Sequence, residues 1–162
     1  MTVPKVFKVF FVLSAAASVS LSMLAPVSLG AATRAVAAPA GAKDIRQAQA
    51  ALRQLVAAYT AGKPADMEAL VSPAMIGYAG IVDAARQASL QKQLRLTLSD
   101  LRAQPSADAT LVLVQARWEK RFVRLPAGVQ VRKSGSAVFT LQRTEDGWKL
   151  SGLSGGNPFA AD

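Results

Sequence analysis

Residues 81–98, IVDAARQASLQKQLRLTL, contain the point at which the hydrophobic pattern of the chain changes. From Ile81 onward, apolar residues recur with the 3.6-residue spacing that places them on one face of a helix. Leu94, Leu96 and Leu98 then alternate with polar residues, which is the two-residue spacing of a half-buried strand. The sequence therefore predicts helices before this stretch and strands after it, an α+β arrangement.

Three helices are predicted in total. Residues 44–62, DIRQAQAALRQLVAAYTAG, carry a long apolar stripe, with Asp44 as the expected N-cap and Gly62 as the expected C-terminal stop. A short second helix is expected from Pro64, because proline is favoured in the first turn of a helix. The third helix is expected to cover residues 81–93.

The chain after residue 108 is predicted to form three more strands. Gly135 is the expected site of a bulge, and residues 144–147 are the expected turn of a hairpin. Residues 152–156, GLSGG, are interpreted as a strand end followed by a flexible tail. The prediction is therefore three N-terminal helices packed on one face of a curved, mainly antiparallel sheet, a cone with a central pocket. The expected bounds of the three strands are residues 109–125, 129–143 and 148–153.

Residues 1–37 have the pattern of a secretory signal peptide. A basic start is followed by an apolar stretch and then by a run of small residues. Cleavage is expected between Ala32 and Ala38, with the bond after Ala37 preferred, and residues 38–43 are expected to be a flexible lead-in. The prediction is an exported protein, periplasmic or secreted, that meets the membrane only transiently during export. An uncleaved anchor in the inner membrane is the alternative.

The composition excludes several kinds of chemistry. The 162 residues include no cysteine and no histidine, so disulfides, thiolate metal sites and Ser-His-Asp catalysis cannot occur. No cofactor and no metal site are expected. The formal net charge is +9, and it falls to +6 without residues 1–37, which hold three basic residues and no acidic one.

Two segments of the chain carry a family resemblance. Residues 57–73, AAYTAGKPADMEALVSP, join the end of one helix to a short second helix through an Ala-Gly stop. Residues 134–159, SGSAVFTLQRTEDGWKLSGLSGGNPF, form a hairpin with a charged glycine turn and a Trp-Lys-Leu sequence. In this order they resemble the nuclear transport factor 2-like superfamily, also called the SnoaL-like or cystatin-like α+β cone, and in particular its exported bacterial members of unknown function. The resemblance implies one such domain over residues 44–159, followed by a tail at 160–162.

The resemblance also implies where catalytic residues would stand, and the sequence departs from the pattern there. In the ketosteroid isomerase branch, a tyrosine and an aspartate occupy the positions of Leu55 and Ala137. A general-base aspartate belongs in the segment that here is residues 72–80, SPAMIGYAG, which has no acid. The dehydratase branch uses histidines, which this chain lacks. We therefore expect no catalytic residue, and a non-catalytic domain that binds a small apolar ligand or a protein partner. The alternatives are an enzyme of the isomerase, dehydratase or cyclase type and a structural cell-envelope interaction protein.

Six residues are candidates for a ligand site in the cone. Five are aromatic, because such residues give a pocket apolar surface and, in tyrosine and tryptophan, a polar group. The sixth is Glu119, which lies in a strand between Arg117 and Arg121. The alternatives are ordinary core packing for the aromatic residues and an ion-pair ladder for Glu119. In the enzyme alternative, Tyr59 or Tyr78 donates a hydrogen bond and Glu119 is the base. The aromatic candidates are Tyr59, Tyr78, Trp118, Phe139 and Trp148.

The basic excess does not predict a nucleic-acid partner. Within residues 117–124, RWEKRFVR, alternation along a strand places Lys120 and Arg124 on the face opposite Arg117 and Arg121. Anionic lipid or a cell-envelope polymer is a more reasonable partner for an exported basic surface. A homodimer is expected through the open sheet face, because the second strand carries apolar residues on both of its faces.

Overall fold

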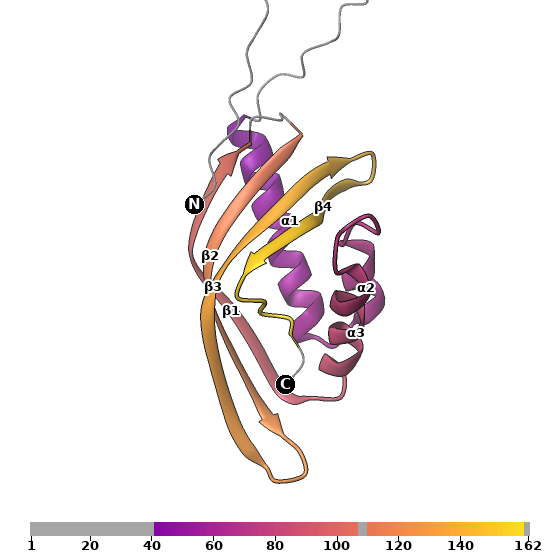
Figure 1. Ribbon diagram of the computed structural model, residues 1–162, viewed down its shortest axis with the longest axis vertical. Helices are drawn as coiled ribbons and strands as arrows, with labels where there is room; N and C mark the ends of the chain where they lie inside the picture. The colour runs from indigo at the N-terminus through magenta and orange to yellow at the C-terminus, as the bar shows by residue number, and fades with distance from the viewer. Residues whose placement is uncertain (1–40, 107–109, 161–162) are drawn as a thin grey trace, which may run out of the picture. The chain divides into compact units, whose positions relative to one another are not determined.

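The computed structural model describes residues 41–106 and 110–160, which form three helices followed by four strands (Figure 1). The strands pair antiparallel in the order β1-β2-β3-β4. The expected signal peptide lies outside the described residues. Among the helices in these residues, none combines the length and the apolar character that a membrane span needs. The bounds are Ala42–Thr60 for α1, Pro64–Ala69 for α2, Tyr78–Ala88 for α3, Lys92–Pro105 for β1, Leu111–Arg124 for β2, Val129–Thr144 for β3 and Gly147–Gly155 for β4.

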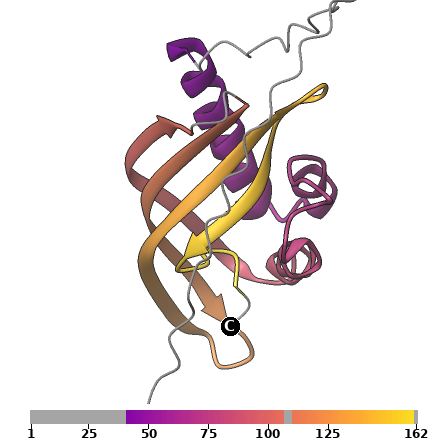
Figure 2. The same ribbon diagram turned by 45° about the horizontal axis from the view of Figure 1, so that its top comes forward.

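The helices lie on one side of a curved, unclosed sheet, so the predicted α+β cone is confirmed. Helix α1 runs along the sheet, and α2 and α3 lie beside the C-terminal end of α1 (Figure 1, Figure 2). Leu52, Leu55 and Tyr59 of α1 belong to one hydrophobic core together with Val114 of β2 and Phe139 of β3. This core forms because the 3.6-residue stripe of the helix and the inward residues of the strands bury each other.

The two ends of α1 are set by local hydrogen bonds and by one glycine. The expectation that Asp44 is the N-cap was wrong, because the helix begins at Ala42 and the N-cap is Gly41. Asp44 is the third helical residue, and its Oδ2 accepts a hydrogen bond of 3.0 Å from the Gly41 N–H. At the other end Gly62 has φ +64°, the left-handed conformation that stops the helix there. The prediction for Gly62 is confirmed.

Helix α3 begins three residues earlier than predicted and is shorter at its end. Gly77, immediately before Tyr78, has φ +86°, and this left-handed residue sets the start of the helix. The helix ends at Ala88, and β1 begins at Lys92. Residues 89–93 were therefore predicted as helix incorrectly. Four of these five residues are polar and Leu90 is 71% exposed, so the pattern does not separate an exposed helix end from a connection.

Gly135 does not form the predicted bulge. It pairs in regular register with Trp118, and the register shift between β3 and β4 falls between Thr140 and Leu141. The glycine is needed for packing, because a Cβ at this position would lie 2.8 Å from Cζ2 of Trp118. The missing side chain of Gly135 makes room for the tryptophan ring.

The chain after β4 turns back onto the sheet, and this corrects the prediction of a flexible tail. Gly155 has φ +81°, and the N–H of Gly156 donates a hydrogen bond of 2.8 Å to the Ser136 carbonyl. Phe159 is then completely buried. We refer to residues 156–160 as the C-terminal segment.

A short connection joins the helical layer to the edge of the sheet. Val71, just after α2, forms an isolated parallel bridge with Leu150 of β4. The Ser72 N–H donates to the Leu150 carbonyl at 2.8 Å, and the Leu150 N–H donates to the Leu70 carbonyl at 2.9 Å. The backbone after α2 therefore pairs with the outer edge of β4.

Candidate functional site

Three aromatic rings fill the space between α1 and the sheet. Tyr59 comes from α1, Phe139 from β3 and Phe159 from the C-terminal segment. The ring centroids of Tyr59 and Phe159 are 5.1 Å apart, and those of Phe139 and Phe159 are 6.4 Å apart, both in edge-to-face arrangements. All three side chains are buried. Edge-to-face pairs of this kind contribute about 0.5–1.5 kcal/mol beyond the apolar surface that they bury. Tyr59 and Phe139, two of the predicted site residues, are thus brought together.

A buried lysine completes this cluster, and the sequence analysis missed it. Lys120 of β2 is 2% exposed. Its Nζ lies 3.0 Å from the carbonyl oxygen of Ala160, 5.6 Å from the ring centroid of Tyr59 and 5.2 Å from that of Phe122. The signal was present, since alternation along the strand places residue 120 on the inward face with Trp118 and Phe122.

The surroundings of Lys120 explain how the fold tolerates it. An ammonium group taken out of water is strongly destabilising unless it is hydrogen-bonded or paired. The Ala160 carbonyl accepts a charge-assisted hydrogen bond, and two aromatic faces lie within cation–π range. The same contacts tie the C-terminal segment to the middle of β2. Lys120 is therefore a charged group in a largely apolar interior.

The two tryptophans occupy different surroundings. The Nε1–H of Trp118 donates a hydrogen bond of 3.0 Å to the Gly156 carbonyl, so Trp118 also holds the C-terminal segment. Trp148 lies at the other end of the β3–β4 hairpin, where it pairs with Arg143. The guanidinium carbon of Arg143 is 5.2 Å from the Trp148 ring centroid. Trp118 is thus part of the contacts around the C-terminal segment, whereas Trp148 packs under the hairpin turn.

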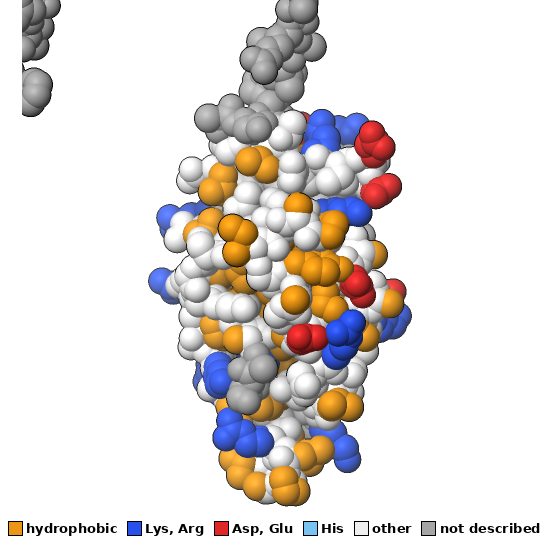
Figure 3. Space-filling view, turned by 45° about the vertical axis from the view of Figure 1, so that its right-hand side comes forward, with side chains coloured by type: hydrophobic (Ala, Val, Ile, Leu, Met, Phe, Trp, Pro, Cys, Tyr) orange, Lys and Arg blue, Asp and Glu red, His pale blue; other side chains and the backbone are white. Residues whose placement is uncertain are grey.

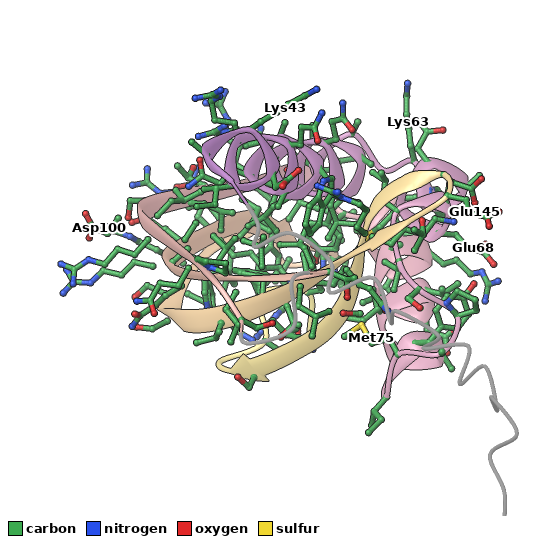
Figure 4. All side chains as sticks on the ribbon, turned by 90° about the horizontal axis from the view of Figure 1, so that it is seen from above. Lys43, Lys63, Glu68, Met75, Asp100 and Glu145 are labelled. Atoms are coloured by element: carbon green, nitrogen blue, oxygen red, sulfur yellow. The ribbon has the colours of Figure 1, made fainter. Side chains whose placement is uncertain are left out.

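Tyr78 directs its hydroxyl group toward the helical layer. At the start of α3 it is half-buried, and its hydroxyl donates a hydrogen bond of 2.8 Å to Oε1 of Glu68 on α2. This hydrogen bond raises the pKa of Tyr78, with desolvation and the charge of Glu68 acting in the same direction. The structure places Glu68 on the surface (Figure 4). The hydroxyl group of Tyr78 therefore contacts a surface carboxylate.

Glu119 lies on the opposite sheet face from Lys120 and Trp118. Its two carboxylate oxygens accept hydrogen bonds from Arg121 of the same strand and Arg132 of β3. The bond from Arg132 and then that from Arg121 lower the pKa of Glu119. This geometry agrees with the alternative of an ion pair across strands. The structure thus separates Glu119 from the aromatic candidates, because odd-numbered residues of β2 face away from the helices.

The other acidic side chains also lie at the surface. None of the carboxylates within residues 41–106 and 110–160 is buried, and no group of three or more of them could hold a metal ion. Acidic and basic side chains are mixed on the face shown in Figure 3, with apolar side chains between them. In the described part of the chain, the buried side chains that can titrate are Lys120 and Tyr59.

Comparisons with solved structures identify the fold. No protein-family model and no curated protein matches the chain. It is similar to a proposed aromatic ring hydroxylase from Novosphingobium aromaticivorans, with 17% identity, a TM-score of 0.62, and 75% of this chain and 99% of that chain covered. A proposed dehydratase of the nuclear transport factor 2-like family from Streptomyces avermitilis has 18% identity and a TM-score of 0.57, covering 68% and 93%. A protein of the same superfamily from Salmonella enterica has 12% identity and a TM-score of 0.56, covering 67% and 87%.

These similarities define an α+β cone. The chain has the nuclear transport factor 2-like fold, which confirms the resemblance found in the sequence. At these identities the similarity shows the fold and transfers no activity.

Proposed function

We propose that this protein is an exported, non-catalytic binding domain that acts through its surface on a protein partner. The observation that carries this proposal is the position of Phe159. Its side chain is completely buried against Tyr59 and Phe139, in the space where a cone of this type would hold a small ligand. A filled interior leaves the outer surfaces as the places where a partner binds.

The residues at the expected catalytic positions support a non-catalytic role. Leu55 and Ala137 are 1% and 2% exposed and belong to the hydrophobic core. They pack there and offer neither a proton donor nor a carboxylate. Glu119, the base of the enzyme alternative, faces away from the interior and has a lowered pKa. A base with a lowered pKa accepts a proton less readily.

Export is supported by the sequence pattern of residues 1–37. The proposed location is the periplasm or the medium, with an inner-membrane anchor as the alternative. The proposed partner is then another protein of that compartment.

A second copy of the chain is the first partner that we propose. Leu111 and Leu113 of β2 and Val138 of β3 lie half-buried on the sheet face away from the helices. Apolar side chains on the central strands of an open face favour covering by another surface. A homodimer through this face would bury them.

A second candidate function is the binding of a small apolar ligand inside the cone. Lys120 supports it, because one polar group in an apolar interior is typical of a ligand pocket. Such a ligand would replace Phe159 between Tyr59 and Phe139. An acidic group on the ligand would take the place of the Ala160 carbonyl at Lys120.

Native mass spectrometry of the protein purified from its own compartment tests both candidates. A dimer without a retained small molecule supports the surface-binding function, whereas a retained apolar molecule supports the second candidate and overturns the first. Leu113→Lys should convert the dimer to a monomer, because it places a charge in the proposed interface. Leu125→Lys is the matched control, since Leu125 is 51% exposed at the end of β2. A wild-type monomer would remove the homodimer proposal.

A further inference from the structure

Three arginines stand side by side across three strands. In the backbone register of the sheet, Arg121 of β2 lies directly opposite Arg95 of β1 on one side and Arg132 of β3 on the other. Neighbouring strands are about 4.8 Å apart, so the row spans about 10 Å. Like charges directly opposite one another destabilise a sheet. We call these three residues the arginine row. A bound anion would reduce the repulsion between their charges.

Glu119 compensates only part of this charge. Its carboxylate holds Arg121 and Arg132 together, and these two arginine side chains remain 59% and 67% exposed. Within residues 41–106 and 110–160, Arg95 makes no ion pair. The row together with Glu119 therefore keeps a net charge of +2. Lys63 and Arg86, by contrast, each pair with an acid three residues away.

The arginine row forms one wall of a groove of about 590 Å³. Gln93, Val123 and Gln130 from the same three strands also line the groove. Leu94 and Phe122 lie between these two sets of residues along the strands and point into the core, so their backbone forms the floor. The groove thus combines guanidinium groups with amide side chains.

We infer that this groove binds a phosphate ester that carries hydroxyl groups. Guanidinium groups present paired N–H donors that match phosphate oxygens, and a phosphate monoester carries close to the two negative charges that balance the row. The amide groups of Gln93 and Gln130 both donate and accept hydrogen bonds, which suits hydroxyl groups. The groove, of about 590 Å³, has room for a polar organic part beside the phosphate group. The groove lies outside the interior of the cone, on the same sheet face as the proposed dimer contact but toward the opposite end of β2 from Leu111 and Leu113.

Two sources share this chemistry, a soluble phosphate ester and the headgroup of a phospholipid. For the first, glycerol 3-phosphate is titrated into the ¹⁵N-labelled protein while the arginine Nε–Hε signals are followed by NMR. The signals of Arg95, Arg121 and Arg132 should shift saturably, and glycerol at the same concentrations should shift none of them. For the second, co-sedimentation is measured with vesicles of phosphatidylglycerol and phosphatidylcholine, and with vesicles of phosphatidylcholine alone.

Two substitutions distinguish binding in the groove from attraction by the overall positive charge of the protein. Arg95→Gln should weaken the binding that is observed by roughly tenfold, the loss expected for a charge-assisted hydrogen bond. Arg117→Gln is the matched control, because it removes the same charge from the same sheet face but lies outside the groove, where Arg117 pairs with Asp100. It should change the affinity less than about twofold. Binding to glycerol 3-phosphate, to anionic vesicles or to both, with this difference between the variants, supports the inference. Binding to neither, or equal weakening by the two variants, overturns it.

Discussion

Lys120 Nζ donates a hydrogen bond of 3.0 Å to the carbonyl oxygen of Ala160, which joins the middle of β2 to the C-terminal segment. The two residues are 40 positions apart in the chain. The contact places a charged group and the backbone of the C-terminal segment together in the interior of the cone. The stability of the domain therefore depends on residues that follow the last strand.

Phe159→Ala tests how much the C-terminal segment contributes to stability. The substitution removes a completely buried ring between Tyr59 and Phe139, so the free energy of unfolding should fall by about 3–5 kcal/mol. Urea denaturation measures the change. Ile76→Ala is the control, because Ile76 is 97% exposed and its loss should change stability by less than about 0.5 kcal/mol. Equal effects of the two substitutions would contradict the burial of Phe159.

Lys120→Ala tests the link between β2 and the C-terminal segment. It removes a buried aliphatic stem and a charge-assisted hydrogen bond, so the free energy of unfolding should fall by roughly 2–4 kcal/mol. Hydrogen exchange of the Phe159 amide, which donates to the Asn157 side chain, should become faster. Lys92→Ala, at an exposed lysine, should change neither quantity appreciably. Unchanged exchange at Phe159 in the Lys120 variant would show that the link does not hold the segment.

Two glycines should respond to alanine in opposite directions. Gly135→Ala forces a methyl group against the Trp118 ring, so stability should fall by about 1–3 kcal/mol and the tryptophan fluorescence should change. Gly80→Ala adds a methyl group within α3 where the space is open, so stability should rise by about 0.4–1 kcal/mol. Urea denaturation of both variants checks the signs. A neutral Gly135→Ala would mean that the ring does not lie against the glycine.

Acid should weaken the ion pairs of Glu119. Its carboxyl pKa is lowered in the folded state, so its contribution to stability is fully present above about pH 4.3, the ordinary glutamate value, and is lost as the pH falls through the lower folded value. A ¹³C NMR titration should give a midpoint for Glu119 below the ordinary glutamate value of about 4.3. In Arg132→Gln the midpoint should rise, since Arg132 is the main cause of the shift. An unchanged Glu119 midpoint in Arg132→Gln would contradict the ion pair between Glu119 and Arg132.

The hydroxyl group of Tyr78 should be harder to ionise than that of an isolated tyrosine. The hydrogen bond to Glu68 raises its pKa, so Glu68→Gln should lower the value toward about 10. Ultraviolet absorbance of the tyrosinate form follows this ionisation. Asp66→Asn, which removes a neighbouring acid of α2, is the control and should leave the pKa of Tyr78 unchanged.

The fold could be predicted because periodicity reports burial directly. The stripe of α1 that includes Leu52 and Leu55 and the alternation of Leu94 and Leu96 in β1 are both buried as expected. The exact ends of the helices were harder to predict, because they depend on single backbone conformations such as that of Gly77. Gly135 was misread since a glycine within a strand signals either a bulge or a close approach, and only the partner strand decides between them.

The candidate site was less predictable, because it depends on contacts distant in sequence. Tyr59 and Phe139 were candidates for a ligand site in the cone and both lie in its interior, yet the ring between them belongs to Phe159, in a segment interpreted as a tail. Glu119 was assigned to the cone, whereas alternation in β2 places it on the other face. Lys120 was placed on the strand face opposite Arg117 and Arg121, but it was not recognised as a buried residue. Its burial requires the carbonyl of Ala160, which no local pattern reveals.

The backbone pairing of Val71 with Leu150 has a consequence for self-assembly. An exposed strand edge can add a strand from another molecule and so begin a fibril. The pairing after α2 occupies the edge of β4, and the β1 edge is interrupted where Gln93 and Asp100 adopt positive φ values. With neither edge continuous, the addition of a strand from another molecule is disfavoured at both edges, which leaves the face of the sheet as the surface for the dimer proposed above.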